Sequence, residues 1–237
     1  MVGSIPSMWF YFGGLALAFV SLILVAIATG TTSWIVFQAS YQGNTVTEHL
    51  GLFQFCLYTN VEECQSNIGG DPDAFICGDH TNRMTNQFFM SVQSSGVLAT
   101  LFAAGAIFFA LFRKIFPNTT FFGMNIRGYH GLFEAILAGL ASLQAFYAWS
   151  GFIFIVQYWI NCGVSFCDTL TSGVPSSFTT SCGFNYSFAL CIIAWIFLAM
   201  SCVSFAVVHM IEGRAARAAA TTAQPLSPSN YAELIQQ

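Results

Sequence analysis

The cysteines are the residues of this chain whose type and spacing could support chemistry. Such residues can form disulfides, bind zinc or exchange electrons. Redox catalysis favours a Cys-x-x-Cys spacing, which the sequence lacks. Six cysteines fall in two polar segments, and an even number in oxidising surroundings predicts disulfides more strongly than a zinc site. They are Cys56, Cys64 and Cys77 in the first segment and Cys162, Cys167 and Cys182 in the second.

The pairing of these cysteines is only partly readable. Cys56 and Cys64 are the most local pair, so we expect them to be bridged. The others then include either a bond between the two segments or one within the second segment alongside a free Cys77. Cys191 and Cys202 lie in an apolar run and are expected to be small buried residues.

Composition predicts a membrane protein. The 237 residues are 56% hydrophobic and only 7% charged, whereas soluble domains carry about 25% charged residues. The net charge of −4 without a basic cluster argues against a nucleic-acid partner. His49 and His80 have acids nearby, but no nucleophile–base spacing or metal-binding pattern accompanies them. We therefore expect no enzyme activity, no catalytic residue, no cofactor and no metal.

Four apolar segments are long enough to cross a bilayer, which requires about 20 residues. They are residues 9–29, 88–112, 131–160 and 184–211. The expected fold is mainly α, a left-handed bundle of four transmembrane helices. The third segment is longer than the hydrocarbon core requires, so its far end is expected to protrude.

Basic residues indicate the orientation of these helices. Arg113, Lys114 and Arg127 lie in the 113–130 loop, and Arg214 and Arg217 follow the fourth segment. The positive-inside rule then places residues 1–8, 113–130 and 212–237 in the cytosol, and residues 30–87 and 161–183 outside. This is the pattern of a multi-pass membrane protein with both termini cytosolic.

The C-terminal segment 212–237 is expected to be disordered beyond a short helical extension. Within it, Tyr231 and Leu234 fit the Tyr-x-x-apolar pattern of endocytic sorting signals. Such four-residue matches are common by chance.

Polar residues inside the apolar segments should face other helices or a cavity, because they are expensive in lipid. Gln93 and Gln144 are of this kind, and Glu134 is expected to reach Arg127 or the interface. Small residues recur four apart in the same segments, which predicts close packing within the bundle.

Residues 54–64 predict a β-hairpin. Phe55, Leu57 and Val61 favour strands, and Thr59-Asn60 favours a turn. A bridge between Cys56 and Cys64 would clamp this hairpin.

The first polar segment resembles a known family signature. Trp34 follows the first apolar run, and Gly51-Leu52-Phe53, Cys56, Cys64 and Arg83 come after it. This order is similar to the W…GLW…C…C…R pattern of the claudin, peripheral myelin protein and channel γ-subunit superfamily. Within it, the chain resembles the claudin-like (Clc-like) proteins of nematodes. Phe53 departs from the pattern by lacking an indole N–H.

The resemblance implies a small extracellular antiparallel sheet on the helix bundle. Trp34 and residues 51–53 would form its base, the Cys56–Cys64 disulfide would tie two strands, and Arg83 would hold the sheet to the helices. The cysteines at 77, 162, 167 and 182 depart from the usual claudin pattern. The C-terminal residues 233–237 also lack the hydrophobic ending of a PDZ ligand.

Two functions follow from this resemblance. The first is a claudin-like protein of cell–cell contacts, including tight junctions, that binds itself or related membrane proteins in cis and in trans and contributes to adhesion and a paracellular barrier or pore. Glu62 and Glu63, beside Cys64, would give that pore a preference for cations; these acids could equally be solvated loop residues. The alternative is an auxiliary subunit that controls the trafficking and gating of an ion channel or receptor.

Overall fold

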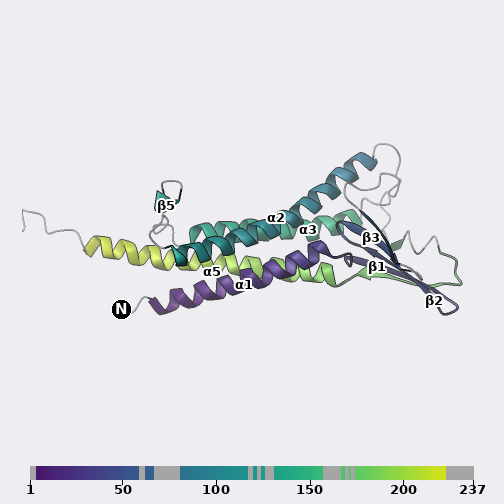
Figure 1. The fold of residues 1–237 in the computed structure, drawn as a ribbon, viewed down its shortest axis with the longest axis horizontal. Coiled ribbons are helices and arrows are strands. Elements are labelled where there is room, and N and C mark those ends of the chain that lie inside the picture. Colours follow the sequence, from purple (N-terminus) through teal and green to yellow (C-terminus); the bar gives the residue numbers. More distant parts are fainter. Residues whose placement is uncertain are drawn as a thin grey trace, which may run out of the picture.

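The structure is a computed structural model that describes residues 4–58, 62–66, 81–116, 120–121, 124–125, 131–156, 167–168, 171 and 174–222. Four long helices run side by side, and a five-stranded sheet sits at one end of them (Figure 1). The four helices are long and apolar enough to cross a membrane. The expected combination of a mainly helical architecture with a small antiparallel sheet is therefore confirmed.

The helices extend beyond most of the apolar limits read from the sequence. They are α1 (Ser4–Gly30), α2 (Thr81–Ile115), α3 (Leu132–Phe154) and α5 (Tyr186–Thr222). Thus α2 begins within the segment expected to be the first loop. The short helical extension expected in the tail continues to Thr222. Helix formation needs only backbone hydrogen bonds and favourable residues, and the alanines after residue 214 have the highest helix propensity.

The third helix, α3, is shorter than the segment expected from the sequence. Its regular part ends at Phe154 and a π-type turn continues to Val156. Residues 157–160, which were expected to protrude as helix, lie outside the described part of the chain.

The five-stranded sheet is antiparallel throughout, in the order β4-β3-β2-β1-β7. Its strands are β1 (Ile35–Tyr41), β2 (Asn44–Leu50), β3 (Gln54–Tyr58), β4 (Glu62–Ser66) and β7 (Thr179–Phe184). The expected hairpin therefore exists as β3 and β4, with residues 59–61 outside the described part. The fifth strand, β7, comes from the second polar segment and was not predicted. A separate two-stranded pair, β5 (Thr120–Phe121) and β6 (Met124–Asn125), lies at the other end (Figure 1).

Small residues line the buried faces of the helices, as their spacing predicted. Two of the three buried clusters along the bundle consist largely of alanine, including Ala99, Ala103 and Ala145. A Cβ atom added to Gly14 of α1 would lie 3.0 Å from the Cβ of Ser204 of α5. Close helix packing is possible because these positions carry little side chain.

The third cluster, next to the sheet, contains most of the large buried side chains. Trp34, Leu52, Phe89, Phe152 and Phe188 meet there. Large side chains gather where the sheet joins the helices, and this cluster therefore fixes the position of the sheet on the bundle.

Candidate functional site

Trp34 occupies the centre of the junction between sheet and helices. The side chain is fully buried, and its Nε1 donates a hydrogen bond of 2.6 Å to the carbonyl oxygen of Ala28, near the end of α1. The indole ring lies 4.8 Å from the ring of Phe152 in α3 and 5.9 Å from that of Phe188 in α5. One side chain thus joins three helices to the start of β1.

The backbone of Trp34 completes this junction. Its N–H donates to the Leu50 carbonyl at 3.1 Å, and its own carbonyl accepts from the Asn185 N–H at 2.9 Å. The strands β1, β2 and β7 are therefore held together where they enter the helices. The resemblance implied this position for Trp34 at the base of a sheet.

Gly51 and Leu52 form a turn that presses against the linker after α1. The Gly51 N–H donates to the Gln54 carbonyl at 2.9 Å. A Cβ atom at Gly51 would lie 2.6 Å from both the Thr31 carbonyl oxygen and the Thr32 Cα. Leu52 is fully buried, whereas Phe53 is half-buried against the same cluster. Glycine is required here because backbone approaches backbone.

Gln93 holds this turn to α2. Its carboxamide is buried, and Nε2 donates a hydrogen bond of 2.6 Å to the Leu52 carbonyl. The sequence predicted that this glutamine faces other helices or a cavity, but its partner is a backbone carbonyl in the turn before β3. Arg83, which the resemblance assigned to the task of holding the sheet, lies in the first turn of α2, and its side chain is outside the described part. We define Trp34, Gly51, Leu52 and Gln93 as the sheet–helix junction.

Two disulfides reinforce the sheet region. Cys56 and Cys64 are bridged and face each other in the register of β3 and β4. Cys167 and Cys182 are also bridged, which ties β7 to the segment before it. The second bond is one of the alternatives read from the sequence, a bridge within the second segment. Cys77 and Cys162 lie outside the described residues.

The remaining cysteines sit in α5. Cys191 is buried and Cys202 is half-buried, and both are free. This confirms the prediction of burial for Cys191 fully and for Cys202 in part.

Among the described residues, no group of three or more His, Cys, Asp or Glu side chains is placed to hold a metal ion.

One face of the sheet carries acidic and apolar side chains in a cross-strand row. Phe37, Glu48, Leu57 and Glu63 are successive partners in the registers of β1, β2, β3 and β4. Glu48 is half-buried, and burial raises the pKa of its carboxyl above the ordinary value. Glu63 is exposed.

This register changes which carboxylates belong together. The sequence grouped Glu62 with Glu63 because both lie beside Cys64, where the resembled family carries charge. In the sheet, Glu63 shares its row with Glu48 instead, because cross-strand partners lie on the same face. Glu62 pairs in register with Tyr58, and its side chain is outside the described part.

Charged residues are distributed unevenly between the two ends of the molecule. Arg113 and Lys114 end α2, and Arg214 and Arg217 lie near the end of α5, so all four are at the end opposite the sheet. Glu48, Glu63 and Asp168 lie at the sheet end, as does Arg83 in the first turn of α2. Two further acids, Glu134 and Glu212, lie at the opposite end. Tyr231 and Leu234, the candidate sorting signal, are outside the described residues.

The chain matches no protein-family profile, and no curated protein matches it significantly.

Proposed function

We propose that the protein is a multi-pass protein of the plasma membrane with a claudin-like fold, and that it acts in adhesion between cells. The observation that carries this proposal is the sheet–helix junction. Trp34, Gly51, Leu52 and the Cys56–Cys64 disulfide occupy the base of an antiparallel sheet mounted on four apolar helices. These are the residues that carry the resemblance to the claudin superfamily.

The surface of the helices supports insertion in a bilayer. Large apolar side chains are exposed along all four helices, including Phe19, Leu101, Leu143 and Val203, each at least half exposed. Such surfaces are unfavourable in water and favourable against lipid tails. The lipid bilayer is therefore the environment that the helix surfaces contact.

The charge distribution supports an orientation with the sheet outside the cell. The basic residues at the ends of α2 and α5 lie opposite the sheet, in agreement with the positive-inside rule. The two disulfides among the described residues lie on the sheet side, where an oxidising compartment would preserve them. The sheet is then the part of the molecule available to a neighbouring cell.

A border-enrichment assay tests adhesion. A tagged copy is expressed in cells that lack junction strands, and fluorescence is compared between two kinds of border. Enrichment where two expressing cells meet, but not where an expressing cell meets a bare one, is the result expected from binding in trans to a second copy. Uniform labelling of the surface would contradict self-adhesion and favour the alternative, an auxiliary subunit of a channel or receptor.

A paracellular pore built from this sheet would prefer cations, because carboxylates attract cations and repel anions. The row that contains Glu48 and Glu63 is the surface that carries this preference. Replacing both residues by glutamine should reduce the cation preference of a cell layer measured by dilution potentials. Glu212→Gln, at the opposite end of the molecule, is the control, and it should leave the potentials unchanged. Equal potentials for the double variant and the unmodified protein would refute the role of this row.

A further inference from the structure

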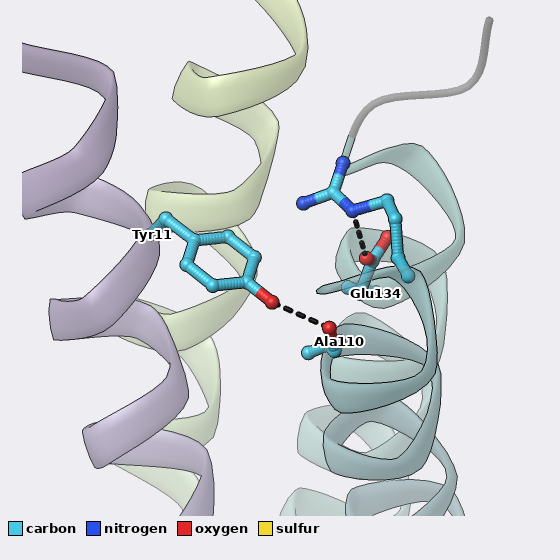
Figure 2. Close-up of polar contacts among 4 residues, drawn as sticks. Tyr11, Ala110 and Glu134 are labelled. Carbon is cyan, nitrogen blue, oxygen red and sulfur yellow. Dashed lines mark hydrogen bonds and ion pairs between the residues drawn. The ribbon is translucent and has the colours of Figure 1, made fainter. Parts of the chain in front are cut away.

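A buried ion pair joins α2 to α3 at the end opposite the sheet. Arg113 Nε in the last turn of α2 lies 3.1 Å from Glu134 Oε1 in the first turn of α3 (Figure 2). The side chain of Glu134 is only 2% exposed, and that of Arg113 is 13% exposed. Glu134 is the only charged residue among the buried ones in the described part of the chain.

The other two helices enclose this pair. Tyr11 of α1 donates a hydrogen bond from its hydroxyl to the Ala110 carbonyl, and its ring centroid lies 5.1 Å from the guanidinium carbon of Arg113 (Figure 2). Tyr11 in turn contacts the ring of Phe205 in α5 at 6.1 Å. All four helices therefore meet around one buried pair of charges.

The start of α3 is pressed against α5 at the same level. Gly131 has φ of 71°, and a Cβ atom there would lie 2.6 Å from the Phe205 carbonyl oxygen. The first turn of α3 has little freedom to move while α5 is in place. Glu134 consequently remains buried as long as the four helices stay closed.

The bonding of the pair is incomplete. Arg113 Nη1 is buried and has no hydrogen-bond partner within the described residues, and Glu134 Oε1 is close to Nε without the alignment of a hydrogen bond. These two buried atoms therefore have no hydrogen bond to a described residue, although the ring of Tyr11 lies against the guanidinium group. A pair of this kind adds little net stability, whereas removal of one partner leaves an uncompensated buried charge.

We propose that Arg113 and Glu134 form a charge clasp. The closed packing of the helices at this end tolerates both charges or neither, but not one alone. The sheet end is held independently by the sheet–helix junction and its apolar cluster, so loss of one charge opens only the end opposite the sheet. This proposal does not depend on the proposed adhesive function.

Amide hydrogen exchange on the full-length protein in lipid nanodiscs tests the clasp, because it reports opening locally. In Glu134→Gln, exchange should accelerate at least about tenfold in residues 108–115 and 132–138, because the charge of Arg113 is left buried and unpaired. Residues 148–152 of α3 and 188–192 of α5, next to the sheet, should exchange at their original rate.

Three further variants make the result decisive. The double change Arg113→Met with Glu134→Leu removes both charges and should restore exchange to near its original rate. Arg113→Lys keeps the pair of charges and should also remain protected. Arg214→Gln removes an exposed charge from the same end of α5 without removing either member of the clasp and should have no effect.

Several outcomes would overturn the clasp. They are unchanged exchange in Glu134→Gln, equal acceleration at both ends of the bundle, or a double variant as fast as the single one. If the single variant fails to fold, the double variant and Arg113→Lys still decide, because both must fold and remain protected.

Discussion

At the scale of single residues, Gly51 shows how closely the sheet approaches the helices. One of its two Hα atoms points at the backbone of Thr31 and Thr32. A Cβ atom in that position would lie 2.6 Å from the Thr31 carbonyl oxygen and from the Thr32 Cα. Backbone cannot move aside as a flexible side chain can. We predict that Gly51→Ala lowers the free energy of unfolding by about 2 kcal/mol and reduces the amount of protein at the cell surface.

Thermal unfolding in detergent checks this prediction. Gly183→Ala in β7 is the matched control, because a Cβ atom at Gly183 meets nothing within 4 Å. The control should keep the melting temperature of the unmodified protein. A similar loss in both variants would show that glycine matters at Gly51 for chain flexibility rather than for close approach.

The carboxyl group of Glu48 should make the sheet pH-sensitive. Its pKa is raised by burial, so the folded state binds the proton more tightly than the unfolded state does. Stability is then lost as the pH rises from the unfolded pKa through the higher folded pKa. Glu48→Gln should therefore raise the melting temperature at pH 7. The expected gain in the free energy of unfolding is less than about 1 kcal/mol, because the side chain is only half-buried.

The comparison at two pH values isolates this effect. At about pH 3.5 the carboxyl is protonated in both states, and the variant should match the unmodified protein. An equal gain at both pH values would assign the effect to packing rather than to charge.

At the scale of elements, the Cys56–Cys64 bridge fixes β4 to β3. The bond closes a loop with a sequence separation of 8. We predict that replacing both cysteines by alanine costs about 2–3 kcal/mol, mainly by freeing the unfolded chain. On heating, the amide protection of β3 and β4, the sheet signal, should be lost earlier, while the amide protection of the four helices, the helix signal, persists.

The control for this prediction is the pair of free cysteines. Cys191→Ala with Cys202→Ala removes two thiols from α5 without touching a disulfide. This control should lose the sheet signal at the same temperature as the unmodified protein. Simultaneous loss of the sheet and helix signals in the Cys56/Cys64 variant would mean that the two parts do not unfold separately.

The elements that could be predicted from the sequence are those encoded by local composition. Four apolar runs predicted four helices, and the alternation around Cys56 predicted the β3–β4 hairpin. The strand β7 was not predicted because Ser181 and Gly183 interrupt its strand-favouring residues. Its pairing with β1, which is distant in sequence, supplies the rest of its order. Helix ends were misplaced because α2 begins in polar sequence and α5 continues into an alanine-rich segment beyond the apolar run.

The sheet–helix junction shows, for single residues, the same limit on what the sequence can predict. Trp34 and Gly51 could be singled out by their resemblance to a family pattern. Gln93 was marked only as a polar residue in an apolar segment, because its partner Leu52 is far away in sequence. Glu48 was not singled out at all, since its place beside Glu63 depends on the register of three strands.

At the scale of the whole molecule, the proposed orientation has a direct test. The β1–β2 turn at Gln42 and Gly43, both with positive φ, projects at the far end of the sheet (Figure 1). An epitope inserted there should be labelled by antibody on intact cells. An epitope after Gln237 should be labelled only after the cells are permeabilised.

Both labelling patterns have to hold together. Labelling of both epitopes on intact cells would reject the three membrane crossings, by α2, α3 and α5, that the proposed orientation places between them. The reverse pattern would place the sheet, with its disulfides, in the reducing compartment and would contradict the orientation on which the adhesive function depends.

The pairing of β1 with β7 has a consequence for biosynthesis. Ile35–Tyr41 leaves the ribosome well before Thr179–Phe184, and about 140 residues lie between them, which corresponds to roughly 10–30 s of synthesis. During that interval one side of β1 has no partner from its own chain. An unfinished chain thus offers a β-edge to any neighbour, and a chaperone or a second nascent copy could occupy it before β7 arrives.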